Sequence, residues 1–256
     1  MAQTTHSQDR LRSVLVLAAT ACTIVFNALA AAGYVNGVSP EVISNKYLTV
    51  LTPAGYAFSI WSLIYVGIIA FSVYQMLPSQ LVRQRPVRTL YVLSCLLNCA
   101  WIYFWHREQI ALCLGLIVGL WVTLILILRR FRDAEEPGSS LLTTAPFGLY
   151  AGWVTAASLV NLAIMLKWAN VEMSPAGWNI FGAVCIAAAA ALAVAARVWL
   201  GNFIFPLAIS WAVSAIAVKQ SGNTAIVVAA AFAAVTGLVT AGSVVTTLKD
   251  STTRYQ

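Results

Sequence analysis

Hydrophobic and polar positions alternate along this chain on the scale of whole helices. Long, mostly apolar runs are separated by short segments that carry most of the Lys, Arg, Asp and Glu residues. Because a helix needs roughly 20 mostly apolar residues to cross the hydrocarbon core of a bilayer, these runs predict membrane-spanning helices. The eight predicted spans are 13–35, 55–76, 87–105, 109–128, 141–166, 177–197, 202–218 and 223–247.

The composition supports the same class of protein. The 256 residues are 61% hydrophobic and 9% charged, with a mean hydropathy of +0.83. A water-soluble protein of this length cannot bury so much apolar surface in a single core. We therefore predict an all-α integral membrane protein, an eight-helix bundle. We expect the first helix to be retained, because its apolar run is longer than that of a cleavable signal peptide.

The positive charges predict an orientation. With eight spans, eleven Lys and Arg residues fall on one side of the membrane and four on the other. The eleven are Arg10, Arg12, Arg83, Arg85, Arg88, Arg129, Arg130, Arg132, Arg197, Lys249 and Arg254, and the four are Lys46, Arg107, Lys167 and Lys219. We expect the protein to lie in the cell (inner) membrane. By the positive-inside rule, both termini are then expected on the cytoplasmic side, with residues 1–12 as a cytoplasmic tail. The net charge is +7, but the Lys and Arg residues are scattered between spans and form no patch with interleaved aromatic residues. We therefore expect no nucleic-acid partner.

Most residues that support enzyme or pump chemistry are missing from the predicted spans. Their interiors hold essentially no ionisable side chain, and no metalloprotease, nucleophile-elbow or phosphate-loop motif occurs. This argues against ion-coupled transport and ordinary acid–base catalysis, and leaves enzymatic activity open. The five cysteines lie inside spans and are expected to pack as small apolar residues. His106 could ligate a haem iron, although a histidine at a helix end beside charges is more often interfacial.

The remaining candidates are aromatic and amide side chains, which form stripes on three predicted helices. Helical spacing places Trp61 with Tyr65, Asn98 with Trp101 and Trp105, and Tyr150 and Trp153 with Asn161. Converging rings would form a slot for a large, flat, apolar molecule with a few polar edges. Alternatively, the rings belong to an interfacial belt and the amides join helices. Membership of such a belt explains Trp61, Trp101 and Trp153 less well, because they lie six or more residues inside their spans.

Two further features concern packing. The loop 36–54 is long enough either to fold over the mouth of the bundle or to be a plain exposed connector. Glycine pairs at 115/119 and 148/152 allow close helix approach. We interpret them as packing within the bundle, with a homodimer seam as the alternative.

Three motifs occur in order on three helices. Pro53 lies eight residues before Trp61 in WSLIY, and LLNCAWIYFW and LYAGWVTAASLVN follow. This pattern resembles the translocator-protein, or tryptophan-rich sensory protein (TspO/MBR), family over roughly residues 13–168. The resemblance implies a five-helix core at 13–168, and leaves 169–256 as a three-helix C-terminal extension. Ser59 and Leu149 stand where the family usually has proline.

The family resemblance implies a pocket on the side of the loop between helices one and two. It implies that the pocket binds porphyrins and sometimes sterols, and that the protein is a sensor or carrier. Such a protein requires no cofactor, although it can hold a bound porphyrin or haem. The implied ligand-binding residues are Pro53, Trp61, Tyr65, Asn98, Trp101, Trp105, Tyr150, Trp153 and Asn161. If the protein is an enzyme, the family suggests light- and oxygen-dependent attack on the porphyrin. The alternatives are a structural or assembly subunit, with a homodimer or membrane-protein partner, and a facilitator that moves a neutral hydrophobic molecule across the bilayer.

Overall fold

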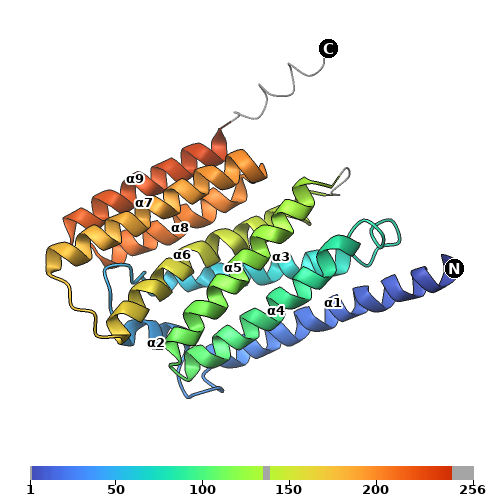
Figure 1. Ribbon diagram of the computed structural model, residues 1–256, viewed down its shortest axis with the longest axis horizontal. Helices are drawn as coiled ribbons and strands as arrows, with labels where there is room; N and C mark the ends of the chain where they lie inside the picture. The colour runs from blue at the N-terminus through green and yellow to red at the C-terminus, as the bar shows by residue number, and fades with distance from the viewer. Residues whose placement is uncertain (1, 135–138, 244–256) are drawn as a thin grey trace, which may run out of the picture.

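The computed structural model describes residues 2–134 and 139–243, and these residues form helices and loops without a strand (Figure 1). The elements are α1 Ala2–Ala31, α2 Pro40–Lys46, the short 3₁₀ helix η1 Gly55–Ser59, α3 Ile60–Tyr74, α4 Arg85–His106, α5 Ile110–Arg132, α6 Thr144–Trp168, α7 Pro175–Leu200, α8 Ile204–Lys219 and α9 Thr224–Gly242. The predicted all-α fold is confirmed.

Each of the eight predicted spans corresponds to one long helix, with η1 and α3 together forming the second. In the described part of the chain, seven spans are long and apolar enough to cross a membrane. The exception is α8, whose 16 residues extend about 24 Å at 1.5 Å per residue. This is less than the hydrocarbon thickness of about 30 Å. α8 instead packs against α6, α7 and α9.

The two ends of the chain differ from the predicted boundaries. α1 begins at Ala2, so the described part of the expected tail is helical and continues the first span. The helix ends at Ala31, and Gly33 follows with a φ of +82°, which glycine adopts readily. Residues 244–247 of the last predicted span, together with Lys249 and Arg254, lie outside the described residues.

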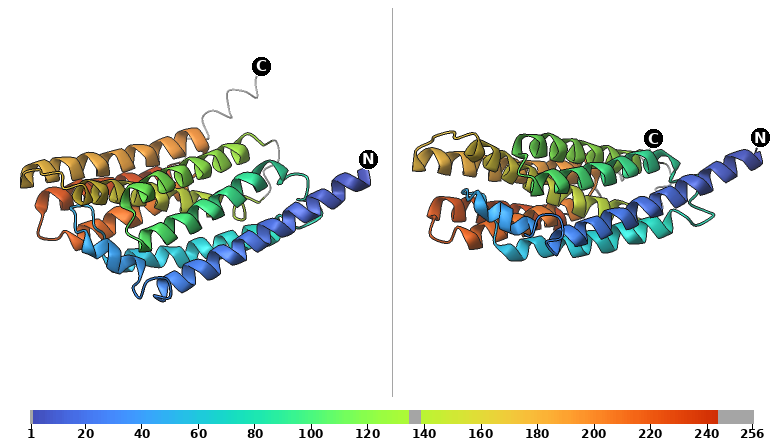
Figure 2. Two further views of the ribbon diagram at one scale, coloured as in Figure 1. Left: turned by 60° about the horizontal axis from the view of Figure 1, so that its bottom comes forward. Right: turned by 90° about the horizontal axis from the view of Figure 1, so that it is seen from below.

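The helices run up and down, so that α1 begins and α9 ends at the same end of the bundle (Figures 1 and 2). α6 is the most buried span. It packs on α3 and α5 on one side and on α8 on the other. A Cβ atom at Gly148 would overlap the Asn202 side chain, and one at Gly152 would lie 2.6 Å from the Phe205 carbonyl oxygen. The predicted packing role of the 148/152 pair is therefore confirmed.

The 115/119 glycine pair does not pack closely. A Cβ atom at Gly115 would meet no other atom within 4 Å, and one at Gly119 would meet only Leu97, at 3.8 Å. The prediction of close packing inside the bundle is wrong for this pair, because α5 turns these positions away from the backbone of its neighbours.

Polar side chains follow the buried face of α1. Asp9, Ser13, Thr20, Thr23 and Asn27 are all buried, at spacings of three, four and seven residues that keep side chains on one helix face. Thr20 Oγ1 lies 2.6 Å from the Tyr91 hydroxyl, and Asn27 Nδ2 donates to Asn98 Oδ1 at 2.7 Å. Hydrogen bonds of this kind hold helices together where lipid supplies no hydrophobic force between them.

A buried ion pair lies at the end of the bundle where α1 begins. Arg85 and Arg88 of α4 both contact the carboxylate of Asp9, with Arg88 Nη1 at 3.5 Å from Oδ1. Arg88 also donates from Nε to Gln75 Oε1 at 2.8 Å. Asp9 precedes the predicted span 13–35, and Arg88 is the second residue of the span 87–105. The pair therefore lies at the edge of the spans and not in their interiors, with each side chain 3% exposed.

Candidate functional site

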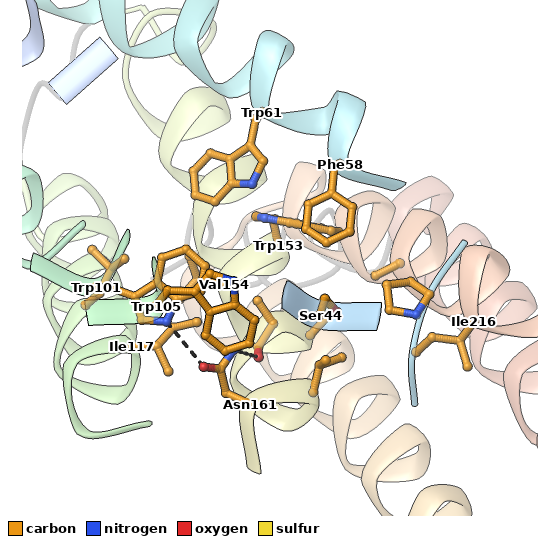
Figure 3. A pocket seen from close by; sticks show the side chains of 16 residues that line it. Ser44, Phe58, Trp61, Trp101, Trp105, Ile117, Trp153, Val154, Asn161 and Ile216 are labelled. Atoms are coloured by element: carbon orange, nitrogen blue, oxygen red, sulfur yellow. Dashed lines mark hydrogen bonds between the residues drawn. The ribbon is translucent and has the colours of Figure 1, made fainter. Parts of the chain in front are cut away.

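A mostly buried cavity of about 50 Å³ lies between α3, α4, α5, α6, α8 and the loop 36–54 (Figure 3). Most of its lining is aromatic or aliphatic. The lining residues are Ser44, Pro53, Phe58, Trp61, Trp101, Trp105, Ile117, Leu120, Trp153, Val154, Ala156, Ala157, Val160, Asn161, Ala212 and Ile216.

The rings of the cavity form two groups. Trp153 makes edge-to-face contacts with Trp61, at a centroid distance of 6.3 Å, and with Phe58, at 6.0 Å. Trp101 and Trp105 stack on one another with centroids 5.5 Å apart and ring planes 22° apart. Figure 3 shows the first group beneath α3 and the second nearer Asn161. The cavity therefore presents aromatic surface from two directions, as a flat ligand requires.

Local sequence explains this placement. Trp101 and Trp105 are one helical turn apart on α4, so their indoles stack along one face. Trp153 and Asn161 are two turns apart on α6, and the residue between them on that face, Ala157, is small enough to leave space. Phe58, in η1, precedes Trp61 by three residues and lies on the same side of the chain.

The polar atoms of the cavity differ in how well they are satisfied. Trp101 Nε1 donates to Asn161 Oδ1 at 3.2 Å, and Asn161 Nδ2 donates to the Ala157 carbonyl oxygen at 2.8 Å. Trp105 Nε1 donates to the Pro40 carbonyl oxygen at 3.1 Å. Trp153 Nε1 is buried and has no partner among the described residues. Buried indole nitrogens usually find an acceptor, so Trp153 has a donor available for a ligand.

Six of the nine residues predicted to bind a ligand line this cavity. They are Pro53, Trp61, Trp101, Trp105, Trp153 and Asn161. Trp105 is 3% exposed and is therefore no belt residue. Whether these six bind a ligand stays a prediction.

The other three predicted residues lie behind the cavity wall. Tyr65 stacks on Trp61 at 5.6 Å, and Tyr150 contacts the edge of the same indole at 5.7 Å. Asn98 donates to the Tyr150 hydroxyl at 2.8 Å and accepts from Asn27. Asn98 therefore joins α1, α4 and α6, which is the helix-joining role that the sequence left open for the amides.

Two helices contribute lining residues that the sequence motifs did not indicate. Ile117 and Leu120 come from α5, and Ala212 and Ile216 come from α8. Because α8 belongs to the predicted C-terminal extension, the first five helices alone do not form the cavity. Aliphatic residues inside an apolar run carry no distinguishing signal. Phe58 could have been found from its spacing of three residues before Trp61.

The loop 36–54 closes one side of the cavity. Ser44 and Pro53 are lining residues, and the loop is held to the segment after α4 by polar contacts. Glu108 accepts from Lys46 Nζ at 2.7 Å and from the Tyr47 hydroxyl at 2.6 Å. Asn36 Nδ2 donates to the His106 carbonyl oxygen at 2.7 Å. The loop 36–54 therefore folds over the mouth of the bundle, which is the first of the two predicted alternatives, and is no plain exposed connector.

The same contacts shift two pKa values outside the spans. Hydrogen bonds from Lys46 and Tyr47 lower the pKa of Glu108. Burial, followed by the hydrogen bond to Glu108, raises the pKa of Tyr47 to about 12. Glu108 is therefore a carboxylate and Tyr47 a neutral phenol at physiological pH, and the loop contact is fully formed there.

His106 does not belong to this cavity. It is buried, with Nδ1 at 2.8 Å from the Ile102 carbonyl oxygen, and it is absent from the lining. His106 is the last residue of α4, beside Arg107 and Glu108, so an interfacial position stays a prediction. Ligation of a haem iron in this cavity would need a different residue.

Fold and site together define a multi-pass α-helical membrane protein with a mostly buried aromatic cavity beneath a loop. A family model described as TSPO-like protein matches residues 13–243. The chain belongs to this TSPO-like family, which confirms the resemblance carried by the motifs. The match extends beyond the motifs and includes α7, α8 and α9. Searches among curated proteins and among solved structures found no match.

Proposed function

We propose that the aromatic cavity binds a flat, mostly apolar ligand, with a tetrapyrrole as the best candidate, and that the protein acts as a sensor or carrier of it. The observation that supports this most directly is the unpartnered indole nitrogen of Trp153 in a cavity walled by four tryptophans. Aromatic faces on two sides suit a macrocycle, and the free donor suits a polar atom at its edge.

Binding requires the cavity to open. Its volume of about 50 Å³ is far below the roughly 300–1,000 Å³ of cavities that hold drug-sized ligands. Movement of the elements around the cavity would enlarge the site. A ligand would thus replace ring-to-ring contacts of the empty cavity with its own stacking contacts.

The lining favours a metal-free macrocycle over haem. None of the lining residues is His, Cys or Met, which are the usual protein ligands of haem iron together with Tyr. A porphyrin without iron needs no protein ligand to a metal, and the cavity offers it stacking surfaces and the indole donor of Trp153. A sterol fits less well, because it presents no flat aromatic face to the indoles.

The proposed orientation follows from charge. Described arginines at 10, 12, 83, 85, 88, 129, 130, 132 and 197 lie at the end of the bundle where α1 begins. Lys46, Arg107, Lys167 and Lys219 lie at the opposite end. By the positive-inside rule, the start of α1 would then lie on the cytoplasmic side of the cell (inner) membrane. The loop 36–54, which covers the aromatic cavity, would lie on the other side.

The test is a titration of purified protein with protoporphyrin IX, followed by the Soret absorbance. We expect saturable binding at micromolar ligand or below. Trp101→Ala should weaken binding about tenfold, since stacking on one aromatic side chain is worth about 1–3 kcal/mol. Trp199→Ala is the matched control, because Trp199 is 68% exposed and distant from the lining. Absence of binding at micromolar ligand would overturn the tetrapyrrole proposal.

A further inference from the structure

A second hollow lies on the outer face of the bundle, between α3, the start of α6 and α8. It is a groove of about 570 Å³, much larger than the aromatic cavity. Leu63 and Val66 form one rim, and Leu207 forms the other. These side chains are 59%, 62% and 37% exposed. Because α3 and α6 belong to spans, the groove faces the hydrocarbon of the bilayer, and apolar molecules dissolved there can reach it.

The groove and the cavity are lined by neighbouring residues of the same two segments, which form the wall between them. In the segment that joins η1 to α3, Phe58 and Trp61 line the cavity while Ser59 and Ile60 line the groove. On α8, Ala212 lines the cavity, and its neighbour Trp211 lines the groove. Consecutive residues thus face opposite hollows on both sides of the wall.

Neutral contacts fasten this wall. Trp211 Nε1 donates to the Ala57 carbonyl oxygen at 3.0 Å, and the Trp211 ring meets Tyr56 edge to face at 5.3 Å. One backbone bond, from Ala54 N to the Ala215 carbonyl oxygen at 2.9 Å, lies deeper. The described residues show no ion pair across the wall. A single neutral hydrogen bond contributes only about 1 kcal/mol, and a 3₁₀ segment such as η1 has poor hydrogen-bond geometry.

The loop side of the cavity is fastened more firmly. There Glu108 accepts hydrogen bonds from the Lys46 ammonium group and the Tyr47 hydroxyl, and Trp105 and Asn36 donate to backbone carbonyl oxygens. The Lys46–Glu108 pair is partly exposed and contributes little by itself. The loop is nevertheless held by four side-chain donors, against one, Trp211, on the wall toward the bilayer. Between the two walls, the one toward the bilayer has the weaker closure.

We propose that the ligand passes between the bilayer and the cavity through the groove between α3 and α8, with Trp211 as the gate. This inference rests on the proposed function, because it concerns the path to the same cavity. An apolar ligand partitions into hydrocarbon and reaches Trp211 there without crossing the charged loop. Swinging the Trp211 indole away from Ala57 would join the two hollows.

The test uses wild-type protein in lipid vesicles and the fluorescence of protoporphyrin IX dissolved in the same bilayer. Leu63→Trp combined with Leu207→Trp narrows the groove from both rims. We expect the association and dissociation rates each to fall about tenfold, a barrier increase of ~1.4 kcal/mol, with an unchanged Kd. Both rates change together because the groove lies on the path and not in the bound state.

The matched control places the same side chains elsewhere on the lipid-facing surface. Leu96→Trp combined with Val239→Trp alters residues of α4 and α9 that are 63% and 66% exposed, and it should leave both rates unchanged. Trp211→Phe removes the bond to Ala57, and should raise both rates about fivefold. Glu108→Gln loosens the loop and should leave them unchanged.

Three results would overturn the proposal in different ways. Unchanged rates in the narrowed groove would exclude this path, and faster exchange in Glu108→Gln but not in Trp211→Phe would place the path at the loop. A changed Kd in the narrowed variant would make the groove itself the binding site. If wild-type protein binds no protoporphyrin, the proposed function fails first, and this is seen before any variant is measured.

Discussion

Trp101 Nε1 and Asn161 Oδ1 are 3.2 Å apart and form a hydrogen bond that ties α4 to α6 at the cavity wall. Trp153, on the same helix as Asn161, has a buried indole nitrogen that finds no partner within residues 2–134 and 139–243. The two tryptophans therefore differ in what their N–H groups do in the empty protein. One stabilises the bundle, and the other is available to a ligand.

This contrast predicts different effects for the same substitution. Trp153→Phe should cost about 1 kcal/mol less stability than Trp101→Phe, because only Trp101 loses a hydrogen bond. Trp153→Phe should also weaken protoporphyrin binding about fivefold through the lost donor. Thermal unfolding in detergent and a Soret titration measure the two effects. Equal losses of stability, with full affinity retained in Trp153→Phe, would contradict this assignment.

The Trp101–Asn161 bond itself can be measured with a double-mutant cycle. The variants are Trp101→Phe, Asn161→Ala and their combination, with unfolding followed in mixed micelles. Coupling between side chains within membranes averages about 0.6 kcal/mol and reaches about 1.7 kcal/mol, and we expect a value in this range. Strictly additive losses would show that the two side chains act independently.

Asn98 should prove a structural residue. Asn98→Leu leaves the buried Asn27 amide and Tyr150 hydroxyl without their shared partner, which should cost about 1–3 kcal/mol of unfolding free energy. Because Asn98 does not line the cavity, the Kd for protoporphyrin should stay within about twofold of the wild-type value. A large loss of affinity in a variant of normal stability would instead place Asn98 at the ligand.

The loop contact should depend on pH in a defined direction. The pKa of Glu108 is lowered from 4.5, so its contribution is present above pH 4.5 and is lost as the pH falls through the lowered value. The pKa of Tyr47 is raised from 10.0 to about 12, so its contribution is present below pH 10 and is lost as the pH rises toward 12. Between these limits, the stability of the loop contact should be constant.

Hydrogen exchange of the α2 amides, corrected for the intrinsic effect of pH, measures this contact. Exchange should be constant from about pH 5 to 9 and faster below pH 4.5. Glu108→Gln should exchange about two- to fivefold faster at neutral pH, since a partly exposed pair contributes only about 0.2–1 kcal/mol. A wild-type profile that changes between pH 5 and 9 would point to another titrating group.

The sequence predicts the helices well because lipid imposes a strong pattern. Long apolar runs located all eight long helices, seven of which are long enough to span a membrane, and ring spacing on three helices located Trp61, Trp101 and Trp153 around one cavity. Helical spacing alone could not show that Asn98 turns toward Asn27, because that depends on which helix lies beside it. The sequence also could not show that Ala212 and Ile216 line the cavity, because their helix is apolar on every side. The buried Asp9 was missed because its partners lie 76 and 79 residues further along the chain.

The central claim is that a flat ligand occupies the cavity between the two groups of indoles. A structure of the protein with bound protoporphyrin IX tests it most directly. We predict macrocycle density between the Trp61–Trp153 group and the Trp101–Trp105 stack, with a polar ligand atom near Trp153 Nε1 and the cavity enlarged. Density confined to the lipid-facing surface, with the cavity rings in the positions described above, would contradict the claim.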